Sequence, residues 1–382
     1  MLKRIKTYIE AKISSSNPLI VNASDYGISA DMMSRDALKV VKKLQESGFQ
    51  AYIVGGCIRD LLLGLSPKDF DVATNAHPAE VKALFKRSRI IGRRFQIVHV
   101  QLSRELIEVT TFRSNEKIQQ SDQGDRSTHR AQSKSGLLTR DNVFGSMQDD
   151  ATRRDLTVNA LYYDPSDNSI HDFTNGLEDI EKKVIRIIGN PSSRYREDPV
   201  RLLRVVRFAA KLGFDIDSNT AKSIPKRASD LQQVSPPRLF DETLKLYMSG
   251  MGTATYKLLQ EQGLFKYLVP QLNQIIQSDQ DNTSGLIEQA FVNTDRRIAT
   301  NQRVTPAFIY AVLLWPAVTR KASRYRQKGN SASYSLSKAS SEVISNQIVV
   351  TAIPKPIYYP YEGNMGVANT AASSRWQSCP TS

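Results

Sequence analysis

Two aspartates one residue apart, Asp69 and Asp71, lie in the segment PKDFDV. In a β-strand, residues i and i+2 point to the same face, so a strand over residues 69–74 would project both carboxylates together while Phe70 and Val72 face the core. Two carboxylates on one side repel each other unless a divalent cation lies between them. Hard oxygen ligands of this kind suit Mg²⁺, so the pair predicts a magnesium site.

A glycine pair, Gly55 and Gly56, precedes the aspartates, and Arg59 follows it closely. A Gly-Gly turn lets backbone N–H groups approach an anion, and a guanidinium offers a fork of donors to phosphate oxygens. Combined with the aspartates, these residues predict a metal-dependent phosphoryl or nucleotidyl transfer site. Taken singly, each glycine is equally compatible with an ordinary tight turn, and Arg59 with an ordinary surface arginine.

A third carboxylate, Glu108, belongs to an expected strand. It is out of phase with the apolar residues Ile107 and Val109, so it should point away from their buried face. On these grounds alone Glu108 is as compatible with an exposed strand residue as with a metal ligand.

The stretch from Val54 to Thr74 resembles the active-site region of the class II nucleotidyltransferases, which include the bacterial poly(A) polymerases and the CCA-adding enzymes. The resemblance extends over roughly residues 24–355. It implies two-metal chemistry with Mg²⁺ as cofactor and ATP as substrate. It also implies that Asp69, Asp71 and Glu108 are catalytic, with Asp69 and Asp71 as metal ligands.

The same resemblance implies which residues of this chain bind the incoming nucleotide. The Gly-Gly turn and Arg59 match the motif around its triphosphate, an Arg-Arg-Asp motif contacts ribose and phosphates, and a Glu-Asp-x-x-Arg motif recognises the base. The implied nucleotide-binding residues are Gly55, Gly56, Arg59, Arg154, Asp155, Asn159, Asp198 and Arg201.

A helix expected from Asp198 to Lys211, with Gly213 as its stop, contains the base-recognition pair Asp198 and Arg201. Residues three apart share a helix face, so a carboxylate acceptor and a guanidinium donor could together contact a base edge. The alternative is a helix cap with an ion pair. The helix continues with a basic stripe suited to RNA phosphates, or equally to a solvated face: Arg204, Arg207 and Lys211.

Two segments separate the subfamilies. Residues 90–100 resemble the motif as it occurs in bacterial poly(A) polymerases, with Gln96 in place of an arginine. Residues 236–240 also resemble poly(A) polymerases more than CCA-adding enzymes. We therefore expect template-independent addition of AMP from ATP to RNA 3′ ends. A CCA-adding tRNA nucleotidyltransferase is the first alternative, and a catalytically inactive RNA-binding protein is the second. RNA-decay proteins are possible further partners.

The 382-residue chain has a formal net charge of +14 and a pI near 9.6. This balance favours a polyanionic partner, with nucleic acid ahead of a membrane surface. No Asp or Glu lies between Asp295 and Glu342, although that stretch is rich in Arg and Lys.

The sequence also predicts a location. Two cysteines give no disulfide framework. We find neither a membrane-spanning stretch nor a signal peptide, so a cytoplasmic protein is expected.

Apolar periodicity predicts an α+β fold, with a mixed sheet and helices followed by an all-helical part. The resemblance implies that the first part is a nucleotidyltransferase head and that the helical part is a neck and body. Expected strands cover 51–54, 69–74, 97–102 and 106–112, and expected helices cover 35–47, 78–87, 238–247, 254–262, 285–293 and 306–315. The expected divisions are an N-terminal arm 1–33, the head 34–180 with a mobile loop 114–140, a base-recognising neck 181–250, an RNA-binding body 251–355 and an atypical tail 356–382.

The tail departs abruptly from the family pattern after Lys355. The possible codons for residues 356–365, read one nucleotide later, allow the peptide RYTTPMREIW, which resembles what the family has after Ile-Pro-Lys. We therefore expect a frameshift near Lys355, in the gene or in its sequencing. A naturally divergent tail is the alternative.

Overall fold

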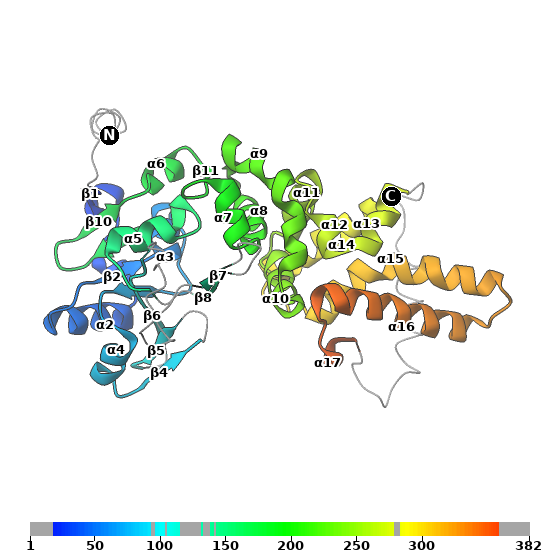
Figure 1. The fold of residues 1–382 in the computed structure, drawn as a ribbon, viewed down its shortest axis with the longest axis horizontal. Coiled ribbons are helices and arrows are strands. Elements are labelled where there is room, and N and C mark those ends of the chain that lie inside the picture. The colour runs from blue at the N-terminus through cyan, green and yellow to red at the C-terminus, as the bar shows by residue number, and fades with distance from the viewer. Residues whose placement is uncertain are drawn as a thin grey trace. The chain divides into compact units, whose positions relative to one another are not determined.

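The computed structural model describes residues 18–92, 96–103, 105–114, 131–132, 138–140, 143–278 and 283–358. The chain divides into two compact units, Met1–Arg227 and Ala228–Ser382. A mixed β-sheet with helices forms the first unit, and the described residues of the second are helical (Figure 1). This arrangement confirms the predicted α+β class. The finer boundaries at 180 and 250 stay predictions.

The first unit is built on an eight-stranded sheet with the strand order β1-β10-β9-β2-β3-β6-β5-β4. Strands β3 and β6 are parallel, whereas every other neighbouring pair in this sheet is antiparallel. The strands are β1 (Leu19–Asn22), β2 (Ala51–Val54), β3 (Asp71–Thr74), β4 (Ser88–Ile91), β5 (Ile97–Gln101), β6 (Leu106–Thr111), β9 (Leu161–Asp164) and β10 (Ser169–Asp172).

Eight helices of the first unit are described around this sheet. The first of them shows why they form where they do, because the Ser34 hydroxyl caps its start by accepting from the Ala37 N–H at 3.2 Å, and Val40, Val41 and Leu44 are buried. The helices are α2 (Arg35–Glu46), α3 (Gly56–Leu62), α4 (Pro78–Leu84), α5 (Met147–Arg153), α6 (Gly176–Glu181), α7 (Pro191–Glu197), α8 (Val200–Leu212) and α9 (Ser218–Arg227).

Two shorter features complete the first unit. A one-turn 3-10 helix, η3 (Thr157–Asn159), follows α5, and a small parallel pair joins β11 (Val184–Ile185) to β12 (Asp215–Ile216). Gly213 ends α8 in the left-handed conformation, as the sequence predicted.

Two expectations about the first unit were wrong. The N-terminal arm 1–33 is not loose throughout, because Leu19–Asn22 pairs with β10 as an edge strand of the main sheet. The helix expected over 78–87 ends at Leu84, since the chain turns at Phe85 into β4, an apolar-containing strand that pairs with β5. Strand β3 also begins at Asp71, which leaves Asp69 just before it.

The second unit packs its helices around aromatic side chains. The rings of Tyr247 and Phe291 stack with centroids 4.4 Å apart, and those of Phe240 and Tyr310 stack at 5.6 Å. The helices are α10 (Pro236–Tyr247), α11 (Gly252–Glu261), α12 (Phe265–Leu268), α13 (Pro270–Gln277), α14 (Thr283–Ala299), α15 (Pro306–Gln327), α16 (Ala332–Thr351) and α17 (Lys355–Tyr358).

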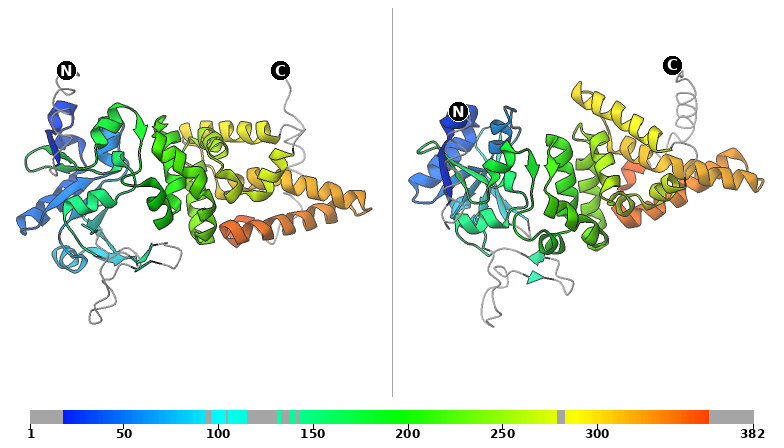
Figure 2. Two further views of the ribbon diagram at one scale, coloured as in Figure 1. Left: turned by 45° about the horizontal axis from the view of Figure 1, so that its top comes forward. Right: turned by 90° about the horizontal axis from the view of Figure 1, so that it is seen from above.

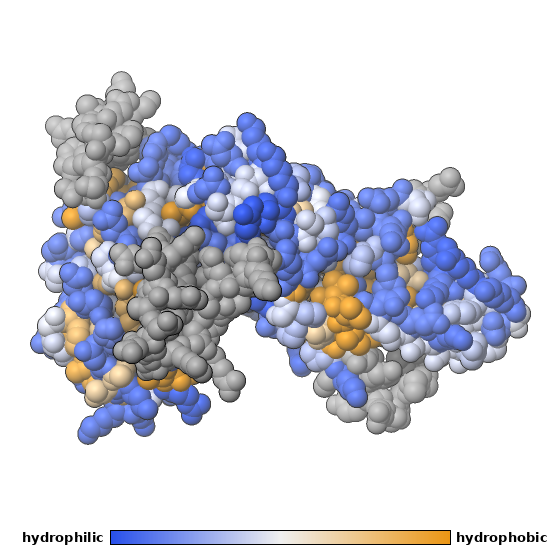
Figure 3. All heavy atoms as spheres, in the orientation of Figure 1, coloured by the Kyte–Doolittle hydropathy of each residue, from blue (hydrophilic) through white to orange (hydrophobic). Residues whose placement is uncertain are grey.

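Helices α15 and α16 form a long hairpin (Figure 2). The predicted end of α15 at Trp315 was wrong, because Pro316 is accommodated inside a helix that continues to Gln327. The end of the hairpin distant from the other helices is largely hydrophilic (Figure 3). Nowhere in the described chain is a helix both long and apolar enough to cross a membrane.

Two expectations fall mostly outside the described residues. Within the loop expected at 114–140, the described residues include a short antiparallel pair, β7 (Ala131–Gln132) with β8 (Leu138–Arg140), so those residues are not an irregular loop. In the tail expected at 356–382, the described residues end at Tyr358, within α17. The frameshift hypothesis concerns residues beyond that point.

Candidate nucleotidyl transfer site

Two of the three predicted carboxylates, Asp71 and Glu108, lie on neighbouring central strands of the main sheet, and Asp69 lies just before one of them. Asp71 is the first residue of β3, and the parallel register pairs it with Glu108 of β6. Ile107 and Val109 are buried while Glu108 is exposed, which agrees with the predicted alternation. Asp69 is exposed just before β3, and Phe70 between the aspartates is buried.

The electrostatics of Asp71 show that these carboxylates act on each other. Partial burial first, and then the negative charge of Glu108, raise the pKa of the Asp71 carboxyl to about 6, while Arg154 opposes the rise and Asp69 adds to it. Glu108 has one further neighbour, because the His99 Nε2 lies 3.3 Å from its Oε1. The site therefore holds negative charge that the protein itself leaves only partly compensated.

This donor set fits a magnesium ion that also binds substrate. No group of three or more His, Cys, Asp or Glu side chains is arranged to hold a metal within the described ranges. Mg²⁺, however, is usually held by one or two carboxylates together with waters and substrate phosphates, not by a complete cage of protein ligands. Mutually repelling carboxylates on adjacent strands meet that requirement.

The glycine turn lies between β2 and α3. Gly55 has φ 89° and ψ −133°, a conformation that residues with side chains rarely adopt. A Cβ atom on Gly55 would lie 3.6 Å from Arg154 Nη1, and one on Gly56 would lie 3.3 Å from Arg59 Nη2. The turn thus brings the backbone close to two guanidinium groups.

Arg59 is only 2 % exposed and already has protein partners. Its Nε and Nη2 donate to Asp60 Oδ1 at 2.9 and 2.6 Å, and its Nη1 donates to Asn159 Oδ1. Its guanidinium carbon lies 5.0 Å from the centre of the Phe208 ring in α8. Arg59 therefore ties α3 to η3 and to α8, whatever it contributes to a bound triphosphate.

Two residues that the sequence did not single out orient Arg154. Its Nε and Nη2 donate to Asp150 Oδ2 at 3.2 and 3.0 Å, and its Nε also donates to the Tyr162 hydroxyl at 3.0 Å. The Tyr162 hydroxyl in turn donates to Asp150 Oδ2 at 2.7 Å, and burial raises the Tyr162 pKa. The spacing of Asp150 four residues before Arg154 was the one available sequence signal.

The residues predicted to recognise the base, Asp198 and Arg201, lie where α7 ends and α8 begins. Asp198 is the C-terminal cap of α7, and the Arg201 N–H donates to the Asp198 carbonyl at 3.0 Å. The Arg201 guanidinium donates to the Arg194 carbonyl at 2.9 Å and to Glu197 Oε2 at 3.3 Å. Neither Arg194 nor the Glu197 contact was predicted.

Arg194 connects this junction to α5. Its guanidinium donates to the carbonyls of Arg153 and Arg154, and to Glu197 Oε2 at 3.0 Å. Burial and the nearby Arg201 lower the Arg194 pKa to about 10, although Glu197 opposes them. The start of α8 is thus held against the Arg-Arg-Asp segment by a buried guanidinium.

The predicted basic stripe of α8 contacts acidic residues of the same unit. Arg204 Nε lies 2.6 Å from Asp155 Oδ2, and Lys211 Nζ lies 3.7 Å from Asp60 Oδ2. Burial alone would raise the Asp155 pKa, but Arg204, the Leu156 N–H and other partners outweigh it and hold that pKa below its usual value. These ion pairs fasten α8 to the residues around the glycine turn.

Sequence comparisons place the whole chain among known proteins. Residues 51–186 match the family described as Poly A polymerase head domain, and residues 213–276 match the family described as probable RNA and SrmB-binding site of polymerase A. The chain is 42 % identical to poly(A) polymerase I of Salmonella typhimurium over 357 residues, which are 93 % of this chain and 76 % of that protein. It is 36 % identical over 231 residues to a CCA-adding enzyme of Limosilactobacillus reuteri, covering 60 % of this chain and 54 % of that enzyme.

Solved structures show the same fold at lower identity. A CCA-adding enzyme in complex with ATP is 20 % identical with a TM-score of 0.62, covering 95 % of this chain and 82 % of that one. A Bacillus stearothermophilus CCA-adding enzyme in complex with CTP is 24 % identical with a TM-score of 0.52, covering 90 % and 93 % of the two chains. With the carboxylates, the glycine turn and α8 assembled in one unit, the identity across nearly the entire chain shows that this protein belongs to the poly(A) polymerase family of nucleotidyltransferases.

Proposed function

We propose that the protein adds AMP from ATP to the 3′ ends of RNA without a template and releases pyrophosphate. The observation that supports this most directly is the pairing of Asp71 with Glu108 on adjacent parallel strands, with Asp69 close enough to raise the Asp71 pKa further. Such a centre attracts Mg²⁺, an ion that usually takes waters and substrate phosphates as its further ligands.

Asp69 and Asp71 would hold the metal, with Glu108 completing the acidic centre. Bound Mg²⁺ would supply charge neutralisation for the attacking 3′-hydroxyl and the pyrophosphate leaving group. Gly55 and Gly56 would present their backbone to the triphosphate, and Arg154, held by Asp150 and Tyr162, would add positive charge beside them. This rigid support fits a reaction that depends on positioning and charge stabilisation.

Asp198 and Arg201 would select the base, and Asp155 and Asn159 would position the nucleotide through the residues they contact. Glu197 and Arg194 hold the Arg201 guanidinium in place, so its donors have a fixed direction. A fixed carboxylate and guanidinium can discriminate bases by hydrogen bonds alone, without a template strand.

Adenylation is favoured over CCA addition because the similarity to poly(A) polymerase I covers 93 % of the chain, compared with 60 % for the CCA-adding enzyme. We also propose a cytoplasmic location, consistent with a buried free thiol at Cys57.

The test is extension of a short labelled RNA with Mg²⁺ and one nucleoside triphosphate at a time, with products sized on a gel. ATP should give long ladders, and CTP should give little. Efficient use of CTP would instead support a CCA-adding enzyme. RNA binding without any incorporation would support the inactive RNA-binding protein.

A further inference from the structure

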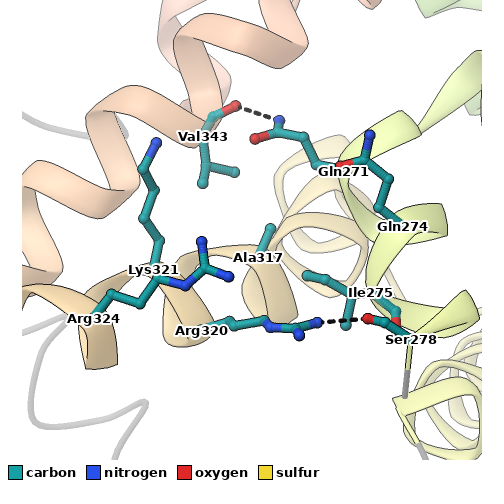
Figure 4. Close-up of a pocket in the computed structure, with 9 residues that line it drawn as sticks. All are labelled: Gln271, Gln274, Ile275, Ser278, Ala317, Arg320, Lys321, Arg324 and Val343. Carbon is teal, nitrogen blue, oxygen red and sulfur yellow. Dashed lines mark hydrogen bonds between the residues drawn. The ribbon is translucent and has the colours of Figure 1, made fainter.

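A polar groove of about 320 Å³ lies in the second unit between α13 and the α15–α16 hairpin. Figure 4 shows its two sides, with Gln271, Gln274 and Ser278 from α13 and its C-terminal cap facing three cations of α15. These cations are Arg320, Lys321 and Arg324. No acidic residue is among those that line the groove.

The three cations differ in how far neighbouring protein groups compensate their positive charges. Arg320 Nη1 donates to the Ser278 hydroxyl at 2.8 Å, a neutral partner that leaves its charge uncompensated. Lys321 forms an ion pair with Glu342 of α16. Arg324 is exposed, and among the described residues it forms no ion pair; Figure 4 shows its guanidinium reaching into the space between the helices.

We propose that this groove binds the phosphodiester backbone of single-stranded RNA, as a second contact besides the acidic centre. Guanidinium groups bind phosphate oxygens as planar forks, and the amide of Gln274 can accept from or donate to ribose and base edges. The Gln271 amide is already engaged, because its Nε2 donates to the Val343 carbonyl at 3.0 Å and its Oε1 accepts from Asn346 Nδ2 at 3.4 Å. The uncompensated charge favours an anionic ligand over a neutral one. The proposal rests on RNA being the substrate. The α13 side of the groove falls within residues 213–276, which match the RNA-binding family, and the proposal adds the cations of α15, which lie outside that range.

The groove offers a matched pair of variants on one helix. Arg320→Gln/Arg324→Gln removes two positive charges inside the groove, and Arg326→Gln/Lys328→Gln removes two exposed charges outside it. Affinity for a labelled single-stranded RNA is measured without ATP and Mg²⁺, at several salt concentrations. The groove variant should bind RNA about tenfold more weakly. The slope of its log affinity against log salt concentration should be shallower by about one to one and a half. The RNA affinity of the control should change by less than about twofold.

A third variant should strengthen binding. Glu342→Gln releases Lys321 from its carboxylate partner, so RNA affinity should rise, and unfolding curves of all variants show that the helical unit is intact. Equal losses in the two double variants, or no rise with Glu342→Gln, would overturn the proposal. Competition by inorganic phosphate alone would indicate a simple anion site, and competition by polyglutamate alone an acidic protein partner. Because no nucleotide is added, these results are independent of whether the enzyme incorporates AMP.

Discussion

Helices α8 and α15 have similar stripes of arginine and lysine, but their partners differ. In α8, Arg204 lies against Asp155 and Lys211 against Asp60, so these ion pairs join the helix to residues near the proposed nucleotide site. In α15, Lys321 pairs with Glu342, but Arg320 donates to a hydroxyl, and neither Arg320 nor Arg324 forms an ion pair within the described part of the chain. A basic helical stripe thus becomes structural or available to RNA according to the carboxylates that the fold brings to it.

RNA binding by Arg204, Arg207 and Lys211 stays a prediction, and the ion pairs of Arg204 and Lys211 set a cost for it. A lysine or arginine already paired to a partly buried carboxylate must give up that pair to bind a phosphate. In the described part of the first unit, Asp69, Asp71 and Glu108 form an acidic centre whose charge is only partly compensated. If the proposed function is right, the first unit supplies acidic residues for metal and the second supplies basic residues for RNA.

The largest effect should come from the acidic centre. Asp69→Ala or Asp71→Ala should lower AMP incorporation about a thousandfold or more, because a lost metal ligand removes several kcal/mol of transition-state stabilisation. RNA affinity should stay near normal, since the α15 groove is unchanged. Glu46→Ala removes an exposed carboxylate that pairs with Lys42 at 3.8 Å and is the matched control. Near-normal activity of either aspartate variant would show that the acidic centre is wrongly assigned.

The next effect concerns stability and pH. Because the Asp71 pKa is about 6 in the folded protein and 3.8 ordinarily, ionised Asp71 destabilises the fold above pH 6. Asp71→Asn should therefore raise the free energy of unfolding at neutral pH by about 3 kcal/mol, and this advantage should shrink as the pH falls from 6 towards about 4. Urea unfolding of both proteins across this range checks it. A variant that is less stable at neutral pH would contradict the raised pKa.

Base choice should respond to the junction between α7 and α8. Asp198→Ala or Arg201→Ala should reduce the preference for ATP over CTP and GTP by about 1–3 kcal/mol, because a polar partner at the base edge is lost. RNA affinity should change less. Competition between the triphosphates measures the preference. If both variants discriminate like the wild type, base selection depends on other residues.

The smallest expected effect is on stability, and it is measured by removing one arginine from α8 and one from α15. Arg204→Gln should lower the free energy of unfolding by about 1–2 kcal/mol, because Asp155 is 9 % exposed and would lose its nearest cation. Arg324→Gln, on the exposed face of α15, should change stability by less than about 0.5 kcal/mol. Equal losses of stability in the two variants would remove the distinction between the stripes.

Local pattern predicted the central part of the site because it depends on neighbours in sequence. The alternation around Glu108 and the glycine stop at Gly213 were both confirmed. The strand Leu19–Asn22 was missed because its only described ladder partner is β10, far along the chain. Helix α16 was missed because its serine-rich sequence lacks a clear apolar face, and packing against α15 decides its structure.

The ion pairs of α8 were outside the reach of sequence reasoning for a similar reason. Asp60 and Lys211 are far apart along the chain, and no periodicity relates them. Tyr162 likewise meets Arg154 only when the end of α5 packs against β9, whereas Asp150 lies four residues before Arg154 and could be anticipated from that spacing. The residue types of the site could be predicted, whereas their compensating partners required the fold.

The central claim, adenylation by this acidic centre, is tested most directly by the composition of the added tail. A short RNA is extended with Mg²⁺ and an equal mixture of all four nucleoside triphosphates, and the added 3′ nucleotides are sequenced. Our account predicts long tails composed almost entirely of A. Tails rich in C, or additions that end after C, C and A on a tRNA substrate, would contradict it.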